Sequence, residues 1–580
     1  MASDGCAGSS PARGTSKIFN IMQKNLIFII SAFALFLMTS CSSKLGELSA
    51  DNFNVVPNPL EAHAGKVPAT INGKFPEKYM KKKAVVNVVP ELRCSNGDVY
   101  QSQGATFQGE KVMGNGQTIS YKVGGNYTMR TSFTYVDPML KSDLYLTFKA
   151  KVGKKNVSVP SVKVASGVLA TPELYRRLLT NGGGCIAPDS FQRVKAQKQE
   201  AQVRFLINQA NLRKSELKSN SVTEFVEMLK KINREREALN IKDVEVLGYA
   251  SPEGNFDFNE KLASKRQNVT SDYVQQQLKN TQVNADINAK YTAEDWDGFQ
   301  KLVQASNIQD KDVILRVLSM YKDPAEREQQ IRNMSAGFRE LADGILPELR
   351  RSRMIINYET VGRSDQQILA QYVDDPTKLS ADELLYAATL VDDANKKEDI
   401  YKKAADLYPR DYRPINNIAA MEFAKGNNDV AKEYIQKTFR TYSKAPEANA
   451  NLGLMALQSG DVATAENYIA QATGANGLND VLGNLSLAKG NYAAAADYLK
   501  NSFNNSAALA EILNKNYATA AVVLNNVKER DAMTEYLQAI NCARQGNNSL
   551  AADFLKKAIQ KDSSLASYAA KDLELINVSK

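Results

Sequence analysis

The residues that could perform catalysis are few, and histidine is the scarcest of them. His63 is the only histidine among 580 residues. A zinc site built from several histidines is therefore excluded, and a Ser-His-Asp triad would have to use His63 itself. The sequence also lacks a nucleophile elbow, paired zinc-ligand spacing and a phosphate-binding glycine loop. These absences predict a protein that is not an enzyme, with no catalytic residues, no metal and no cofactor.

One cysteine lies where covalent attachment of a lipid would be expected. Residues 25–38 form an apolar run that is too short to span a membrane but has the length of a signal-peptide core, and Lys24 supplies a positive flank. The sequence MTSC that ends at Cys41 resembles a lipobox, in which small residues precede a cysteine that becomes acylated. The resemblance implies an outer-membrane lipoprotein with Met22 as its true start. Because no dense acidic cluster follows Cys41, we expect a lipid-anchored, periplasm-facing orientation.

Three cysteines remain after such processing, Cys94, Cys185 and Cys542, and they are dispersed over hundreds of residues. Cys94 and Cys185 could pair in an oxidising compartment, but one thiol would be left over. The spacing is not that of a disulfide framework, and isolated small hydrophobic residues are the favoured interpretation.

Charge and composition indicate water-soluble modules without a nucleic-acid partner. The formal charge of +9 is spread along the chain, and the longest run of like charge is Lys81 to Lys83. The apolar fraction of 43% and the charged fraction of 24% are ordinary for globular protein. A chain of 580 residues is too long for one core, so we expect three or four units.

A second set of residues with chemical potential lies between a predicted strand and a predicted helix. Residues 248–266 read GYASPEGNFDFNEKLASKR. Gly248 and Gly254 frame a tight loop, Asn259 and Arg266 recur at helical spacing, and backbone amides at the start of a helix can face an anion. The pattern predicts a carboxylate-binding site.

This segment resembles the peptidoglycan-binding motif of the OmpA C-terminal domain family, and the resemblance covers roughly residues 197–360. In that family a loop aspartate and a helix arginine grip the diamino acid of the peptidoglycan stem peptide. Arg266 matches the arginine, whereas Ser251 stands at the aspartate position and Glu253 would have to supply the negative charge. The resemblance implies peptidoglycan as the ligand of four residues: Ser251, Glu253, Asn259 and Arg266.

The elements that must position these residues follow from periodicity. Short β-rich segments separated by turn signals predict one or two β-sandwich modules over 55–190, ending in the linker-like composition of 182–188. Strands near 201–207, 244–249 and 354–358, with helices near 221–237 and 258–278, predict an α/β sandwich of OmpA-like type. The helical stretch between 293 and 347 is longer than that domain needs, and it is similar to variants in Bacteroidetes-type OmpA-family lipoproteins.

Internal repeats dominate the last third of the chain. Gly426 and Gly460 are 34 residues apart, each lies five residues before an alanine, and an aromatic residue follows eight residues after each. This is the tetratricopeptide period, in which glycine permits the turn between two helices and alanine lets them approach. About five irregular units are expected from 380 to 575. Such arrays carry a concave partner groove, and by register its candidate residues are Arg413, Asn416 and Glu447.

The sequence therefore predicts a multidomain protein with β-sandwich modules, a central OmpA-like α/β sandwich and an all-α solenoid of tetratricopeptide repeats. The expected segments are 1–40 as upstream extension and signal peptide, 41–54 as anchor linker, 55–190, 195–362 and 375–580. The expected function is that of a non-enzymatic envelope scaffold, with the OmpA-like domain contacting peptidoglycan and the repeats binding other envelope proteins. The alternative is an accessory adaptor of an outer-membrane secretion or uptake complex with a vestigial peptidoglycan site.

Overall fold

The computed structural model describes residues 45–578 apart from 182, 309 and 334–339. The predicted signal segment and Cys41 lie outside these residues. The chain divides into two compact units: Met1–Pro188 together with Ala404–Lys580, and Asp189–Lys403. We call them the sandwich–repeat unit and the α/β unit. In the described residues, no helix combines the length and apolar character needed to cross a bilayer.

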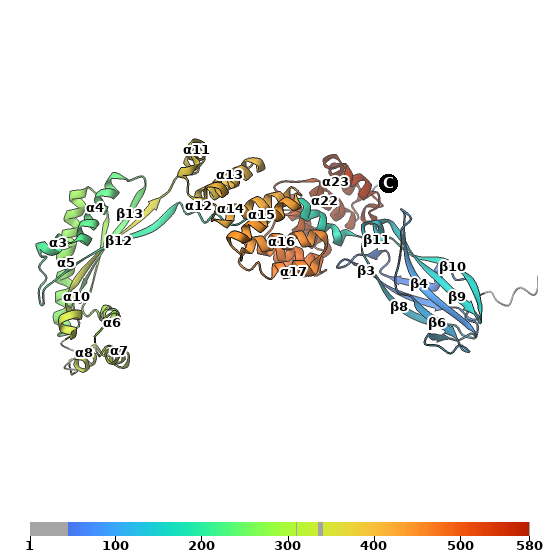
Figure 1. The fold of residues 1–580 in the computed structure, drawn as a ribbon, viewed down its shortest axis with the longest axis horizontal. Coiled ribbons are helices and arrows are strands. Elements are labelled where there is room, and N and C mark those ends of the chain that lie inside the picture. Colours follow the sequence, from blue (N-terminus) through green and yellow to red (C-terminus); the bar gives the residue numbers. More distant parts are fainter. Residues whose placement is uncertain (1–44, 182, 309, 334–339, 579–580) are drawn as a thin grey trace, which may run out of the picture. The chain divides into compact units, whose positions relative to one another are not determined.

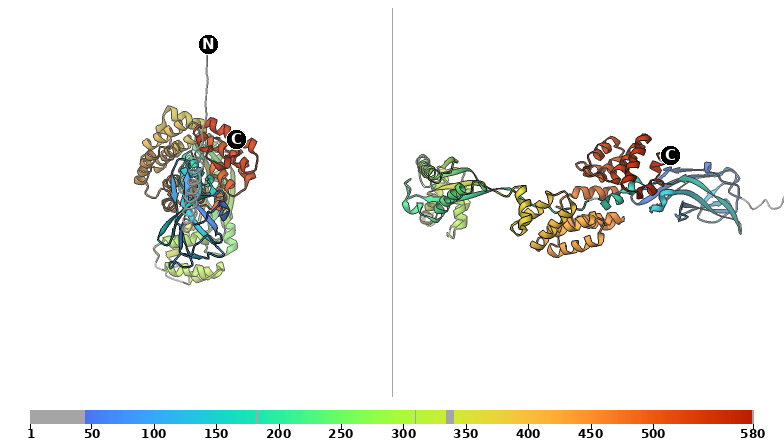
Figure 2. Two further views of the ribbon diagram at one scale, coloured as in Figure 1. Left: turned by 90° about the vertical axis from the view of Figure 1, so that its right-hand side faces the viewer. Right: turned by 90° about the horizontal axis from the view of Figure 1, so that it is seen from above.

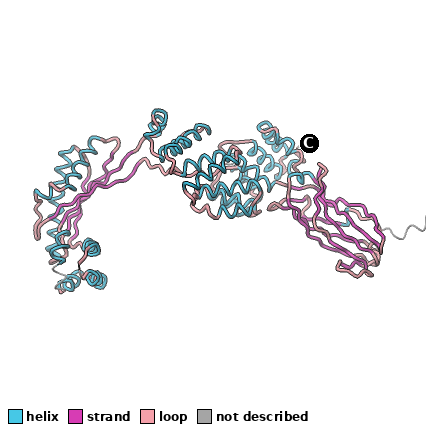
Figure 3. Tube along the Cα trace, in the orientation of Figure 1, coloured by secondary structure: helices cyan, strands magenta, loops and turns pink. Residues whose placement is uncertain are grey.

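The first part of the sandwich–repeat unit is a β-sandwich. Its three-stranded sheet has the order β1 (Phe53–Val56), β3 (Lys66–Phe75), β8 (Gly125–Thr134). Its six-stranded sheet has the order β10 (Lys155–Ser166), β9 (Ser142–Val152), β4 (Ala84–Cys94), β6 (Ala105–Gly109), β7 (Gln117–Ile119), with β5 (Val99–Gln101) paired to β4. Burial alternates along β3, so one face of that strand points into the core that both sheets share. Figure 3 shows this all-strand region apart from the helices.

The chain leaves the sandwich earlier than the sequence predicted. After the short parallel pair β2 (Leu60–Glu61) and β11 (Val168–Leu169), it forms η3 (Thr171–Leu174) and α2 (Tyr175–Asn181). Buried side chains of η3 and α2 belong to the core of the C-terminal helices and not to that of the sandwich. Figure 1 and Figure 2 show this stretch in teal beside the orange and red helices. Residues 171–181 and 183–188 thus belong to the repeat domain, although the repeats themselves lie in the C-terminal part of the sequence.

The described repeats in this unit are five helix pairs followed by a short cap. The pairs are α14 (Tyr412–Ala424) with α15 (Asn428–Thr441), α16 (Pro446–Ser459) with α17 (Val462–Ile469), α18 (Leu478–Ala488) with α19 (Tyr492–Leu499), α20 (Asn505–Leu513) with α21 (Tyr517–Asn525), and α22 (Ala532–Arg544) with α23 (Asn548–Lys561). The cap consists of α24 (Ser564–Ala569) and η6 (Leu573–Leu575). One continuous apolar core runs through all of them, as in a solenoid of stacked repeats.

The turn inside each pair has the conformation that the glycine pattern predicted. The turn glycines have positive φ angles of 73–81°, namely Gly426, Gly460, Gly490 and Gly546. The turn between α20 and α21 has no glycine, and Lys515 occupies the matching position with a φ of 65°. A lysine in this left-handed region carries a steric cost that glycine avoids.

The α/β unit has a four-stranded mixed sheet as its centre. The strand order is β12 (Val194–Arg204), β15 (Arg351–Val361), β13 (Leu239–Tyr249), β14 (Asp286–Thr292), with β13 and β14 parallel and the other neighbours antiparallel. The helices α4 (Asn220–Arg234) and α5 (Phe256–Thr281) share an apolar core with the sheet, which Figure 1 shows beside them. α3 (Lys214–Leu217) precedes α4. The predicted strands and helices are present, and β14 is an additional strand.

The predicted helical stretch between β14 and β15 forms a small core of its own. It contains α6 (Trp296–Ala305), α7 (Lys311–Met320), α8 (Pro324–Arg332), η4 (Leu341–Ile345) and α10 (Leu346–Leu349). After β15 come α11 (Asp365–Asp374), η5 (Pro376–Lys378), α12 (Ala381–Thr389) and α13 (Ala394–Leu407). The border between the two units falls within α13, at Ala404, whereas the sequence predicted that the repeat domain begins at 375.

Replacing Lys515 with glycine should stabilise the repeats by about 0.5–1 kcal/mol, because glycine adopts the required backbone angle without strain. The reciprocal control is Gly546→Lys, at a turn where an added Cβ meets nothing within 4 Å, and it should destabilise by a similar amount. Urea unfolding followed by far-UV circular dichroism measures both. Equal midpoints for Lys515→Gly and the parent would show that this turn is not strained.

Candidate functional site

The loop that carries the predicted carboxylate site joins β13 to α5 in the α/β unit. Gly248 lies at the end of β13, where an added Cβ would come within 2.5 Å of the Ala263 carbonyl oxygen, so glycine lets the strand pack closely on the helix. Asn255 caps α5 by accepting a hydrogen bond from the Asp257 amide at 2.9 Å. The loop is therefore held at both ends.

Arg266, on α5, is fully enclosed by its own domain. It is 1% exposed, and three of its N–H groups donate to the backbone carbonyls of Gln209 (3.0 Å), Tyr249 (2.9 Å) and Leu206 (3.3 Å). Burial, with the nearby charge of Arg350, lowers the pKa of Arg266 to about 10, and Glu253 opposes this shift. In this conformation the guanidinium supports the backbone of two loops.

Glu253 already has a cationic partner within the protein. Its carboxylate accepts two hydrogen bonds from Arg350, at 2.8 and 3.1 Å, and a third from the Ser251 hydroxyl at 2.8 Å. Asn259 donates to the Gly254 carbonyl at 3.2 Å and so fixes the loop. The fold thus brings Ser251, Glu253, Asn259 and Arg266 close together, with Glu253 bound to Arg350, an arginine that the sequence reasoning did not single out.

The helical insertion also contacts this loop. Pro252 lines a small cavity with Trp296 and Phe299 of α6. The carboxylate of Asp295, the residue before α6, forms an ion pair with Arg351 at 3.0 Å. The backbone amide of Asp295 donates a hydrogen bond to the Ala250 carbonyl at 3.2 Å. These contacts hold the loop closed over Arg266.

A second candidate site lies on the concave face of the repeats, and the chain's own residues 183–188 run along it. We call these residues the groove segment. The amide of Cys185 donates to Asn451 Oδ1 at 2.6 Å, and its carbonyl accepts from Nδ2 of Asn451 and of Asn416, both at 3.0 Å. The two asparagines are completely buried. The side-chain amides thus satisfy the main chain of the segment in the way a neighbouring strand would.

A third asparagine repeats this arrangement two residues further on. Asn417 Oδ1 accepts from the Ala187 amide at 2.7 Å, and its Nδ2 donates to the Ala187 carbonyl at 3.1 Å. A spacing of two residues is that of an extended chain, whose alternate residues face the same way. We call Asn416, Asn417 and Asn451 the asparagine clamp. Its hydrogen bonds to the segment are made to the main chain.

The three groove residues predicted from register all lie beside the groove segment. Arg413 donates to the Pro188 carbonyl at 3.4 Å, Asn416 belongs to the clamp, and Glu447 accepts the Asn476 amide at 3.4 Å. Asn417 and Asn451 were missed, although they are 34 residues apart, the same interval that separates Gly426 from Gly460. That recurrence was the signal that could have identified them.

The composition of the groove segment suits its narrow site. A Cβ at Gly184 would lie 2.7 Å from Asn451 Oδ1 and 2.9 Å from the Ala420 backbone. Burial, followed by the charges of Glu447 and Asp480, raises the pKa of the Cys185 thiol to about 12, which suppresses its reactivity. The thiols of Cys94, Cys185 and Cys542 are all free and buried, as the isolated-cysteine interpretation expected.

In the part of the chain that the structure describes, no cluster of three or more His, Cys, Asp or Glu residues could hold a metal ion. His63 packs edge-on against the Tyr492 ring, and its Nδ1 lies 3.3 Å from the Tyr492 hydroxyl. What both sites can do is form hydrogen bonds and ion pairs.

No model of a known protein family matches the chain, and no curated protein has significant sequence similarity to it. Part of the chain is similar to solved structures at low identity. The APC/C hetero-tetramer Cut9-Hcn1 matches with 16% identity and a TM-score of 0.31 over 37% of this chain, which spans only 46% of the length of that one. A tetratricopeptide repeat protein from Parabacteroides merdae matches with 15% identity and a TM-score of 0.26, covering 37% of this chain and 91% of its own.

A third match is pilF from Pseudomonas aeruginosa, with 13% identity and a TM-score of 0.25 over 38% of this chain and 100% of its own. The tetratricopeptide character of the helices rests on the helix pairs and the 34-residue interval described above.

Removing one arm of the asparagine clamp should loosen the groove segment. Asn451→Ala and Asn417→Ala each delete two hydrogen bonds to buried backbone, so each should destabilise the sandwich–repeat unit by about 2–3 kcal/mol. Asn479→Ala is the control, because Asn479 is an exposed asparagine of the same array. Urea unfolding measures the stability, and the rate of thiol labelling at Cys185 measures the local opening. Unchanged labelling of Cys185 in both variants would contradict the clamp.

Arg266→Lys should destabilise the α/β unit by about 2–4 kcal/mol, because an ammonium group cannot serve three carbonyls that a planar guanidinium reaches. The only tryptophan of the chain, Trp296, lies in this unit, so its fluorescence during urea unfolding reports the change. Arg234→Lys, an exposed arginine on α4, should leave the midpoint unchanged. Equal midpoints for the two variants would exclude a structural role for Arg266.

Proposed function

We propose that the protein is a non-enzymatic scaffold of the bacterial envelope, anchored in the outer membrane through a lipid on Cys41 and facing the periplasm. Its repeats bind extended polypeptide, and its α/β unit contacts peptidoglycan. The observation that carries the binding role is the asparagine clamp, which holds the main chain of residues 183–188 by five hydrogen bonds of 2.6–3.1 Å. A surface that satisfies backbone amides and carbonyls in this way is suited to extended protein segments.

The peptidoglycan role is supported by the loop and helix around Arg266. The motif resembles that of the OmpA family, and the fold supplies an arginine, a carboxylate at Glu253 and a glycine-framed loop in one place. Recognition of a diamino acid needs one group for its carboxylate and one for its ammonium, and these two residues have the required charges. Opening of the loop would have to expose them.

The second candidate function is an adaptor of an outer-membrane secretion or uptake complex whose wall site is vestigial. Three features of the loop favour it. Ser251 stands in place of the aspartate, the guanidinium of Arg266 is hydrogen-bonded to backbone carbonyls, and Glu253 is paired with Arg350. A site whose charges are satisfied internally has a weaker attraction for an outside ligand.

Co-sedimentation of the full-length protein with purified sacculi, in detergent, distinguishes the two. If the wall role is right, the parent protein pellets with sacculi, soluble stem peptide releases it, and Ser251→Asp strengthens the binding about tenfold by restoring the missing carboxylate. Glu237→Gln, which removes an exposed carboxylate after α4, should have no effect.

Failure of the parent protein to pellet, together with pelleting of Ser251→Asp, would favour the adaptor. Failure of both would remove peptidoglycan from the proposal and leave the binding role of the repeats to be tested separately.

A further inference from the structure

Beside the groove segment, the concave face of the repeats opens into a hollow of about 740 Å³. One wall is the groove segment itself, from Gly183 to Ile186, together with Leu178 and Leu179 of α2. The opposite wall comes from α18, α20 and the turn 526–531 before α22. The lining residues on that side include Asp480, Asn484, Asn505, Asn526, Glu529 and Asp531.

The hollow continues the surface that already holds a polypeptide. Asn476 lines it and donates Nδ2 to the Ile186 carbonyl at 3.2 Å. The groove segment follows helix α2, and the asparagines that bind its main chain at Cys185 come from α14 and α16. The side of α18 and α20 faces the hollow. The concave face thus has room for a second extended segment next to the first.

Two acceptors of the hollow have no described donor. Oδ1 of Asn505 is buried and receives no hydrogen bond from the protein. The side-chain hydrogen bonds described for the Asp531 carboxylate all end on Oδ1, from Asn505 Nδ2 at 3.0 Å and from the amide and hydroxyl of Thr534. Oδ2 of Asp531 has no described partner. Acceptors in this state suit a ligand that brings several N–H groups.

The charge of the lining residues also favours a ligand that carries a cation. Its carboxylates are Asp480, Glu529 and Asp531, and its only cationic side chain is Lys528. The apolar lining residues are Leu178, Leu179, Ile186, Leu454, Val481, Phe503 and Val527, of which Phe503 is 56% exposed. A lysine or arginine side chain with an apolar neighbour therefore complements the surface.

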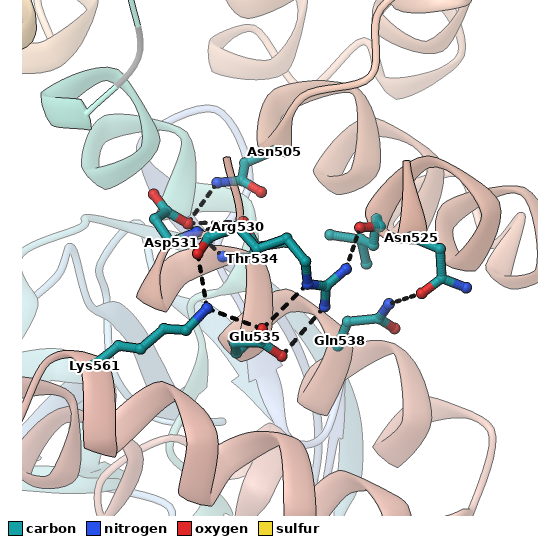
Figure 4. Close-up of polar contacts among 9 residues, drawn as sticks. Asn505, Asn525, Arg530, Asp531, Thr534, Glu535, Gln538 and Lys561 are labelled. Atoms are coloured by element: carbon teal, nitrogen blue, oxygen red, sulfur yellow. Dashed lines mark hydrogen bonds and ion pairs between the residues drawn. The ribbon is translucent and has the colours of Figure 1, made fainter. Parts of the chain in front are cut away.

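An ion network around the buried carboxylate of Glu535 lies behind the turn 526–531 (Figure 4). Glu535, with a side chain 6% exposed, pairs with Arg530 at 3.2 Å and with Lys561 at 3.1 Å. Arg530 donates to the Leu524 carbonyl at 2.6 Å, and Lys561 donates to the Arg530 carbonyl at 2.7 Å. The two cations are bound to Glu535 and to backbone, so they fix the turn in place, and a prearranged surface lowers the entropic cost of binding.

We propose that this hollow binds an extended segment of a partner protein that carries a lysine or arginine next to an apolar residue, alongside the chain's own groove segment. The inference rests on the proposed polypeptide-binding function of the repeats. The inference specifies where on the repeats a partner binds without displacing residues 183–188. It also specifies the kind of side chain that is recognised.

The test uses the full-length protein and three fluorescent octapeptide pools that differ only at a central position, which is lysine, glutamate or leucine. Fluorescence anisotropy should show at least tenfold tighter binding of the lysine pool. Glu529→Lys, in the exposed turn, should abolish this preference, and Asp531→Asn should weaken lysine-pool binding about tenfold while keeping the cap of α22. Asp497→Asn, at an exposed carboxylate on α19, is the matched control and should change nothing.

Equal binding of the three pools, or a lysine preference that survives Glu529→Lys, would overturn the hollow as the site while leaving the repeats as polypeptide binders. No binding of any pool would overturn the inference and also remove the support for the repeats as a polypeptide-binding surface. Sedimentation with sacculi is independent of both results, because it reports on the α/β unit alone.

Discussion

The structure of the sandwich–repeat unit depends on hydrogen bonds between three buried asparagines and the main chain of residues 183–188. Those bonds satisfy backbone groups that would otherwise be buried without partners, so the repeats and the segment stabilise each other. Helix α2 adds apolar side chains to the same core. Through these contacts the described residues up to Pro188 and from Ala404 onward form one compact unit, and the repeats contribute to holding the sandwich as well as presenting a surface.

In the α/β unit, too, buried polar groups are satisfied by partners within the domain, and here those groups are charged. Arg266 and Glu253 are the groups that would recognise a zwitterionic ligand, and both are satisfied within the domain, by carbonyls and by Arg350. Breaking a buried ion pair without replacement is costly, so a ligand must supply equivalent partners. The helical insertion increases the cost of replacing these partners, because contacts of Asp295 and Pro252 attach the loop to the core of the insertion.

Local rules predicted much of this architecture. Alternating burial in β3, the glycine turns of the repeats and the helix bearing Arg266 all follow from short-range patterns. β14 escaped prediction because six of its seven residues are exposed, so the strand has no apolar alternation. The groove segment escaped because its glycines are typical of a linker, and its partner Asn451 is 266 residues away. A contact between residues so far apart in the sequence cannot be predicted from a local pattern.

The same separation determines when the protein can complete its fold. As the chain emerges with its N-terminus first, Asn451 follows Cys185 by 266 residues. Until then Leu178 and Leu179, which the finished repeats bury, have no core to enter. The α/β unit, encoded in between, can fold during this interval. The emerging chain therefore presents an apolar stretch that chaperones for unfolded segments can bind until its own repeats replace them.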